Sequence, residues 1–117
     1  MKVRKLQTIP AQNVTAGDRT SFQVLLGPDE VPNFAMRKFT MLPGGSMPMH
    51  TNSVEHEQYV LNGTAEVVID CEAYKVESND ILYIPAGKPH SYKNIGTDNF
   101  EFLCMVPNNE DIIRITE

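Results

Sequence analysis

Hydrophobic and polar residues alternate in short runs along this chain, and glycine or proline interrupts the runs at short intervals. The sequence contains eight prolines and seven glycines, and the runs between them are rich in Val, Ile, Phe, Tyr and Thr. This pattern favours strands over helices. The predicted strands span residues 21–27, 34–42, 57–63, 64–70, 74–78, 81–85, 90–95 and 100–106. Short strands separated by frequent turn signals predict an all-β sandwich or barrel.

Three connections are open to interpretation at this level. Asn62-Gly63 can adopt the positive φ values of a tight turn, and predicts a hairpin between strands 57–63 and 64–70. The stretch "MLPGGSMPM" at 41–49 is interpreted as a turn. The tail "NNEDIIRITE" at 108–117 is compatible with a final strand or with a short helix.

Size and charge narrow the class of protein. The chain has 117 residues and 41% apolar residues, which predicts a single domain over 1–117. It has no long apolar run and no apolar stretch behind its charged start, so neither a membrane span nor a secretory leader is expected, and the expected location is cytoplasmic. The net charge of −5, with no Lys/Arg cluster beyond "KVRK", argues against a nucleic-acid partner. Two cysteines are too few for a disulfide scaffold.

The chain's three histidines suggest a functional site, because two of them lie close together in "MHTNSVEHEQYVLNG" at 49–63. Strand alternation directs His50 and Asn52 to one face. After a short turn it directs His56 to the same face as Gln58, and Glu57 to the other face. Imidazole nitrogens and an amide carbonyl can bind Mn, Fe, Co, Ni, Cu or Zn. Taken singly, each histidine is also compatible with a surface or hydrogen-bonded position.

The spacing of these residues is more specific. The first run reads Gly44, five residues, His50, one residue, Asn52, three residues, His56, six residues, Gly63. The second reads Asn79, five residues, Pro85-Ala86-Gly87, two residues, His90, three residues, Asn94. Together they resemble the two motifs of the cupin superfamily, and the likeness extends over about residues 30–107. Asn79 replaces a motif glycine, but asparagine tolerates the left-handed backbone region.

The resemblance implies a small single-domain microbial cupin with a jelly-roll β-barrel and a motif region at about 44–94. It implies one divalent transition metal held by His50, His56 and His90, with Asn52 as a weaker ligand. The chain is similar to a cupin subgroup with a four-histidine site, in which Asn52 stands for the second histidine. A competing register makes Glu57 the ligand, although the spacing to Gly63 favours His56. Loss of the metal is the other alternative.

Four further residues are predicted to contact a ligand. Arg37 shares a face with Phe39 and Met41, and an inward arginine needs an anionic partner such as a substrate carboxylate. A surface ion pair is the alternative for Arg37. Gln58 shares the face of His56, and Phe102 and Cys104 share a strand face that would line the pocket behind the metal or simply pack in the core.

Two classes of function remain open. The first is a metal-dependent oxygenase that acts on a small organic acid or phenol, since three neutral histidines leave positions on the metal for other ligands. The second is a non-catalytic module that binds a small anion or sugar. In both, the expected partner is a small anionic ligand, and the expected assembly is a homodimer with residues 1–30 in its interface.

Overall fold

The structure is a computed structural model and describes residues 2–116. It consists almost entirely of strands, with one short 3-10 turn, η1 (Leu6–Thr8). The strands are β1 (Gln12–Asn13), β2 (Asp18–Leu26), β3 (Phe34–Asn52), β4 (His56–Asn62), β5 (Thr64–Ile69), β6 (Glu72–Glu77), β7 (Ile81–Ile84), β8 (His90–Asn94), β9 (Phe100–Pro107) and β10 (Ile113–Ile115). Within residues 2–116, no helix has the length and apolar character needed to cross a membrane.

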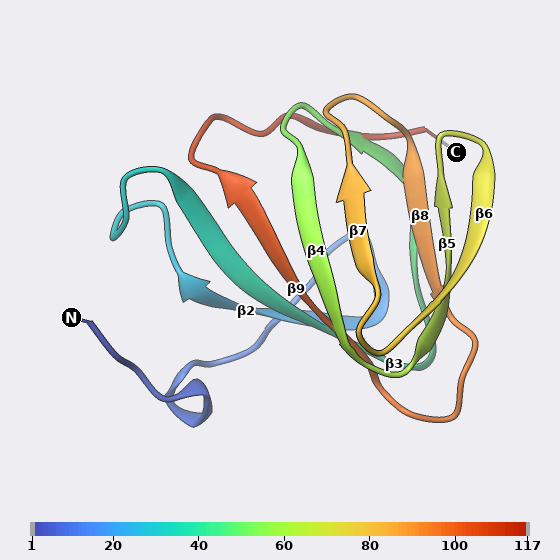
Figure 1. The fold of residues 1–117 in the computed structure, drawn as a ribbon, viewed down its shortest axis with the longest axis horizontal. Coiled ribbons are helices and arrows are strands. Elements are labelled where there is room, and N and C mark those ends of the chain that lie inside the picture. Colours follow the sequence, from blue (N-terminus) through green and yellow to red (C-terminus); the bar gives the residue numbers. More distant parts are fainter. Residues whose placement is uncertain (1, 117) are drawn as a thin grey trace.

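The ten strands form one antiparallel sheet that curls on itself into a jelly-roll, as predicted (Figure 1). The central order is β6-β5-β8-β3-β9-β4-β7, and β2 and β10 add to β3. The long strand β3 belongs to both halves of the barrel. Its first part pairs with β2 and β9, and its second part pairs with β8 and β10. This shared strand joins the two walls that enclose the interior.

The segment 41–49 is part of β3, so its interpretation as a turn is wrong. Gly44 has a φ of +80°, and the pairing of β3 changes from β9, last at Met41, to β8, first at Ser46. The glycines thus bend a continuous strand around the corner of the barrel rather than ending it. Gly45 is packed at this corner, where an added Cβ would lie 2.8 Å from the Leu42 carbonyl oxygen.

The hairpin predicted at Asn62-Gly63 is also wrong. Gly63 does have a positive φ of +86°, but β4 pairs with β7 and β9, whereas β5 pairs with β6 and β8. The turn therefore crosses between the two walls. The hairpin of this region joins β5 to β6 through Asp70 and Cys71, which both have positive φ values. The predicted left-handed backbone at Asn79 is confirmed by its φ of +76°.

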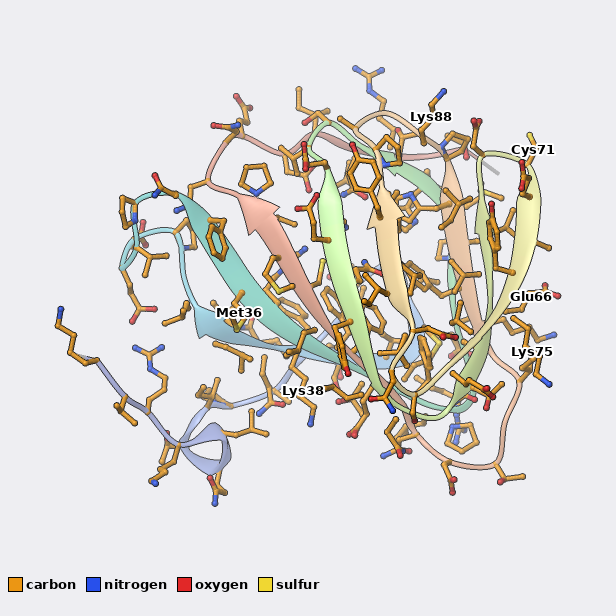
Figure 2. The ribbon with its side chains drawn as sticks, in the orientation of Figure 1. Met36, Lys38, Glu66, Cys71, Lys75 and Lys88 are labelled. Atoms are coloured by element: carbon orange, nitrogen blue, oxygen red, sulfur yellow. The ribbon has the colours of Figure 1, made fainter. Side chains whose placement is uncertain are left out.

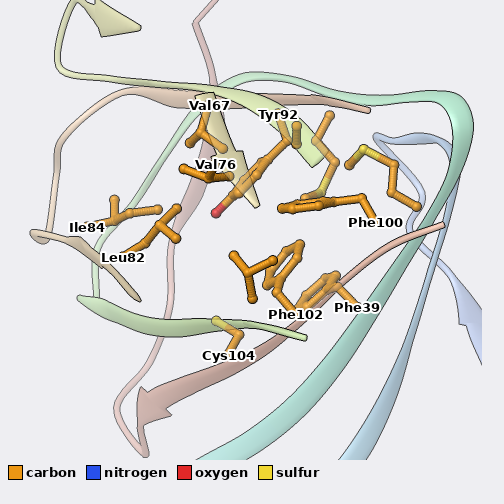
Figure 3. Packing of buried hydrophobic residues seen from close by; sticks show 13 residues of the cluster. Phe39, Val67, Val76, Leu82, Ile84, Tyr92, Phe100, Phe102 and Cys104 are labelled. Carbon is orange, nitrogen blue, oxygen red and sulfur yellow. The ribbon is translucent and has the colours of Figure 1, made fainter. Parts of the chain in front are cut away.

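Alternation along the strands separates a charged exterior from an apolar interior. Glu66 and Lys75 face each other across β5 and β6 and project outward, as Figure 2 shows. The opposite faces supply a continuous core (Figure 3). Its most deeply buried large side chains are Phe100, Phe102, Met41, Ile84, Val60 and Val67. Because this core fills only one end of the barrel, the polar residues of the motifs come to lie beside it, around a cavity.

Candidate metal centre and ligand cavity

A cavity of about 400 Å³ lies between the two walls of the barrel. Its polar lining residues come mainly from β3, β4 and β8: Arg37, His50, Asn52, His56, Gln58 and His90. Its aromatic lining residues are Phe22, Phe39, Tyr92 and Phe102. Residues 12–17 and the β10 residues Ile113 and Ile115 complete its rim. The fold thus brings the three predicted histidines into one cavity.

His50 and His90 lie opposite each other on the paired strands β3 and β8, and their ring centroids are 4.2 Å apart. Nδ1 of His50 lies 2.7 Å from the Pro48 carbonyl oxygen, and Nδ1 of His90 lies 2.9 Å from the Lys88 carbonyl oxygen. A carbonyl only accepts, so each Nδ1 carries the proton and donates it. Each Nε2 is then left with a free lone pair, which is the form of imidazole that binds a metal.

His56 reaches the same cavity from β4, and its ring centroid lies 5.8 Å from that of His90. Its side chain is buried, with 6% of its surface exposed. Glu57 follows it on the strand, so its side chain points to the opposite face. Desolvation first, and then a hydrogen bond and charge repulsion from Glu55, raise the pKa of Glu57 to about 7. The structure therefore places His56, and not Glu57, beside the other two histidines.

Apart from Arg37, three side chains that line this cavity each have a buried polar atom without a hydrogen-bond partner among the described residues. These atoms are Nε2 of His56, Nε2 of His90 and Oδ1 of Asn52. A buried polar atom without a partner is destabilising, so a group of them in one cavity indicates that something else satisfies them. Two imidazole nitrogens and an amide oxygen are donors suited to a divalent transition metal.

The three histidines are not a closed chelate by themselves. In the conformation of residues 2–116, no three His, Cys, Asp or Glu side chains converge closely enough to hold an ion. His50 is only half-buried at the rim, whereas His56 and His90 are fixed in the interior. A metal bound here would use His56, His90 and the Asn52 carbonyl, with His50 turning toward it. The donor chemistry of the site thus fits a metal. The chain's three histidines and one asparagine do not make a four-histidine set.

Burial also keeps two of these rings neutral. Desolvation, followed by the positive charge of Arg37, lowers the pKa of His56 to about 3. Desolvation lowers the pKa of His90 to about 4, against a smaller opposite effect of its hydrogen bond to Lys88. Neutral imidazoles at ordinary pH are available as ligands without losing a proton first.

Behind His56 lies a small buried polar network centred on Cys104. The Cys104 Sγ accepts from Arg37 Nη2 at 3.4 Å and from Gln58 Nε2 at 3.5 Å, and lies 3.6 Å from His56 Nδ1. Gln58 also donates to the Tyr92 hydroxyl at 2.8 Å. Burial raises the pKa of the Cys104 thiol. Cys104 thus contacts the back of His56, while Phe102 forms part of the cavity wall itself.

Arg37 connects this network to the cavity. Its guanidinium lies over the ring of Phe39, 5.0 Å from the ring centroid. Its buried Nε has no partner among residues 2–116, although the side chain lines the cavity. An arginine with an unsatisfied donor in a largely apolar cavity provides a site for an anion.

The aromatic wall is a row of nearly parallel rings: Phe22, Phe39 and Phe102 are paired across β2, β3 and β9, and Tyr92 of β8, a strand that does not pair with β9, contacts Phe102. Successive centroid distances along Tyr92, Phe102, Phe39 and Phe22 are 5.3, 5.1 and 5.7 Å, with interplanar angles of 10°, 8° and 25°. Figure 3 shows the inner three rings of this row packed in the core. Cross-strand pairing of aromatic residues fixes such a row.

Sequence reasoning did not find several of these residues. Tyr92 and Phe39 carry the alternation of interior strand residues, so their burial was available from the pattern, but not their alignment into one row. Phe22, residues 12–17 and β10 reach the cavity from distant parts of the chain. Asp111 accepts a hydrogen bond from Asn52 Nδ2 at 2.9 Å. No local signal marks that contact, because the two residues are 59 positions apart.

Comparison with known proteins shows where this site belongs. Residues 37–106 match the model of the cupin domain family. A polyketide cyclase, RemF from Streptomyces resistomycificus, has a similar structure, with a TM-score of 0.91 and 27% identity over 100% of this chain and 86% of that one.

Two curated relatives are much longer proteins. Mannose-1-phosphate guanylyltransferase of Klebsiella pneumoniae is 33% identical over 94 residues, which cover 75% of this chain and 20% of the relative. Quercetin 2,3-dioxygenase of Bacillus subtilis is 43% identical over 51 residues, which cover 43% of this chain and 15% of the relative. The matched family model spans most of the jelly-roll and both histidine motifs, and the chain belongs to the cupin domain family.

Proposed function

We propose that this cupin is a metal-dependent enzyme that acts on a small organic acid or phenol, with an oxygenase reaction as the leading candidate. The observation that carries the proposal is the group of three inward-facing atoms, His56 Nε2, His90 Nε2 and Asn52 Oδ1, beside Arg37 in one cavity. A divalent ion there would supply a Lewis acid and, if it is redox-active, a site for dioxygen chemistry.

The chain's own residues would bind and orient the substrate. A carboxylate or phenolate oxygen can accept from the free Nε–H of Arg37. The row of stacked aromatic rings gives the cavity an apolar wall against which an aromatic substrate can pack, and this wall excludes water from one side. Because the donors expected at the metal are neutral, they leave the charge of a bound ion undiminished, and Arg37 adds to it. The cavity should therefore attract anions although the chain carries a net charge of −5.

The test has two steps. Metal content is measured on protein purified without a histidine tag, and bound Mn or Fe favours an oxygenase. The metal-loaded protein is then screened by thermal shift against small carboxylates, phenolates and neutral sugars. We expect phenolates and aromatic carboxylates to stabilise it, and Arg37→Gln, a similar but uncharged side chain, to lose most of that effect. Stabilisation by sugars alone would contradict the proposal.

A second candidate rests on the likeness to the polyketide cyclase over the whole chain. In this case the same cavity would promote ring closure in a phenolic or polyketide substrate and consume no dioxygen. Oxygen uptake with the stabilising phenolates separates the two reactions. Turnover that proceeds without dioxygen favours the cyclase, and binding without any turnover identifies a non-catalytic binding module.

The expected homodimer stays a prediction. Tyr59 and Leu61 on β4, and Ile81 and Tyr83 on β7, expose apolar surface on the outside of the barrel, with Ile81 78% exposed. An apolar outer face supports association. Light scattering at micromolar concentration tests it, and a monomer would contradict it.

A further inference from the structure

Asn52 contributes one of the three inward-facing atoms, and its side chain has two chemically different ends. It lies at the end of β3 with 6% of its surface exposed. Its Nδ2 donates to Oδ2 of Asp111 at 2.9 Å, while its Oδ1 is buried without a partner in the part of the chain that the structure describes, and the side chain lines the cavity. The orientation of this one amide decides whether the cavity meets a carbonyl oxygen or an NH₂ group.

The neighbouring carboxylate fixes that choice. An ionised carboxylate only accepts hydrogen bonds, so the end of Asn52 that faces Asp111 must be the NH₂ end. The two ends of an amide have nearly the same shape, and sterics alone would not separate them. Without Asp111, the amide could turn its NH₂ toward the cavity. An NH₂ group is a donor and cannot coordinate a cation.

Asp111 is itself held in place by the C-terminal segment. Its Oδ1 accepts from the Ser53 backbone N–H at 3.1 Å. The Ser53 hydroxyl donates to the Glu110 carbonyl at 3.2 Å and accepts from the Ile112 N–H at 2.7 Å. β10 then pairs with the end of β3, with Ile113 opposite Asn52. The segment therefore carries Asp111 to the outer side of Asn52 and keeps it there.

We propose that Asp111 is a positioning residue, which orients Asn52 so that its carbonyl oxygen faces the metal. The inference rests on the proposed function, because it assigns to the metal the carbonyl oxygen of Asn52, which has no hydrogen-bond partner within residues 2–116. Groups that orient metal ligands from behind commonly change metal affinity by about 10–100-fold. An amide carbonyl is a weak ligand for a transition metal, so the effect of Asp111 should lie near the lower end of that range.

The experiment measures the affinity of metal-free protein for Co²⁺ and Zn²⁺ by competition with a chromophoric chelator. Asp111→Ala is expected to weaken binding about tenfold, and no more than Asn52→Ala does. In the Asn52→Ala background, Asp111→Ala should have no further effect, because it acts through the amide. Ser53→Ala is the matched control, since it removes two hydrogen bonds of the same segment and leaves the Asn52–Asp111 bond in place. It should change affinity less than twofold.

Two results would overturn the inference while the proposed function stands. One is wild-type affinity in Asp111→Ala. The other is an equal loss from Asp111→Ala with and without Asn52, which would mean that only the charge of Asp111 matters. A wild-type protein that binds neither metal overturns the proposed function instead. In that case the side-chain amide resonances of Asn52 in metal-free protein test whether Asp111 orients the amide. Faster proton exchange in Asp111→Ala, but not in Ser53→Ala, supports this orienting role, and unchanged exchange contradicts it.

Discussion

The inner wall of the cavity and its rim are built in different ways. The inner wall consists of His56, His90 and the rings of Phe39, Tyr92 and Phe102, which are fixed by the sheet ladders of β3, β4, β8 and β9 and are buried. The rim consists of His50, residues 12–17 and β10, which are partly or fully exposed. The wall is rigid because each side chain is part of the core, whereas the rim depends on segments that are far apart in sequence.

This difference suggests a division of work between the two regions. The wall provides the chemistry, since the neutral imidazoles and Arg37 lie there. The rim borders the cavity and positions Asn52, because the C-terminal segment contacts Asn52 and contributes apolar side chains to the cavity lining. Changes to the wall should therefore abolish binding or folding, and changes to the rim should tune binding.

The largest effect is expected for the metal-binding side of the wall. His56→Ala should weaken Co²⁺ or Zn²⁺ binding by at least about a hundredfold, more than the roughly 10–100-fold loss caused by changes behind a ligand. Glu57→Ala is the matched control, because this adjacent side chain points to the opposite face. Chelator competition measures both. Full metal binding in His56→Ala together with loss in Glu57→Ala would show that Glu57 is the ligand.

The aromatic row gives the next largest effect, because it runs from the wall to a ring beside the rim. Phe102 within the wall is 1% exposed, whereas Phe22 at the outer end of the row is half-buried and pairs with Gln12. Phe102→Ala should lower the free energy of unfolding by about 3–5 kcal/mol, the usual cost of such a cavity. Phe22→Ala should cost about 1–2 kcal/mol, since it buries less area. Urea titration measures both, and equal losses would mean that wall and rim are not distinct in stability.

Low pH should destabilise the wall of the metal-free protein. Burial holds the pKa of His56 at about 3 and that of His90 at about 4, compared with an ordinary value of 6.5. Between these folded-state pKa values and pH 6.5, the two histidines are protonated in the unfolded chain and neutral in the folded chain. The stabilisation is therefore fully present above pH 6.5, and it falls as the pH drops toward 4. Each histidine should contribute a slope that approaches about 1.4 kcal/mol per pH unit. The raised pKa of Glu57 acts in the opposite direction over this range, because the folded chain keeps a proton that the unfolded chain releases, so the slope is measured in Glu57→Gln protein.

Urea titrations at several pH values test this slope. In the Glu57→Gln background, His90→Gln removes one of the two remaining proton-binding differences, so the slope between pH 4 and 6.5 should fall by about half. A stability of the Glu57→Gln protein that is independent of pH over this range would contradict the burial of the two neutral rings.

The sequence predicted the wall better than the rim. Strand alternation put His56 and Glu57 on opposite faces, and motif spacing grouped His56 with His90; the structure shows both histidines lining one cavity, and their role as ligands stays a prediction. These are local properties, because a strand fixes the faces of its own residues. The strand pattern predicted only an all-β sandwich or barrel, and the resemblance to cupins implied the jelly-roll, which the structure confirms.

The errors concern connections. Gly63 looked like a hairpin because local turn chemistry says that the chain reverses, but it does not say which strand becomes the neighbour. The segment 41–49 looked like a turn because glycines permit bends, and the bend proved to lie inside β3. The contact of Asp111 with Asn52 depends on where the tail returns, which long-range pairing with β3 decides.

The smallest effect is expected at the rim. Ile113 lines the cavity, yet 61% of its surface is exposed, so Ile113→Ala should change the free energy of unfolding by about 0.5 kcal/mol or less. The same variant should lower the affinity for an aromatic carboxylate by a few-fold. Each methylene that a ligand covers contributes about 0.8 kcal/mol, and a tenfold change in affinity corresponds to about 1.4 kcal/mol. The neighbouring Ile112→Ala, a side chain that is 50% exposed, is the control and should leave affinity unchanged. Calorimetry with the most stabilising carboxylate of the screen measures both. Equal losses in the two variants would show that the rim acts through the stability of the tail and not through contact with the ligand.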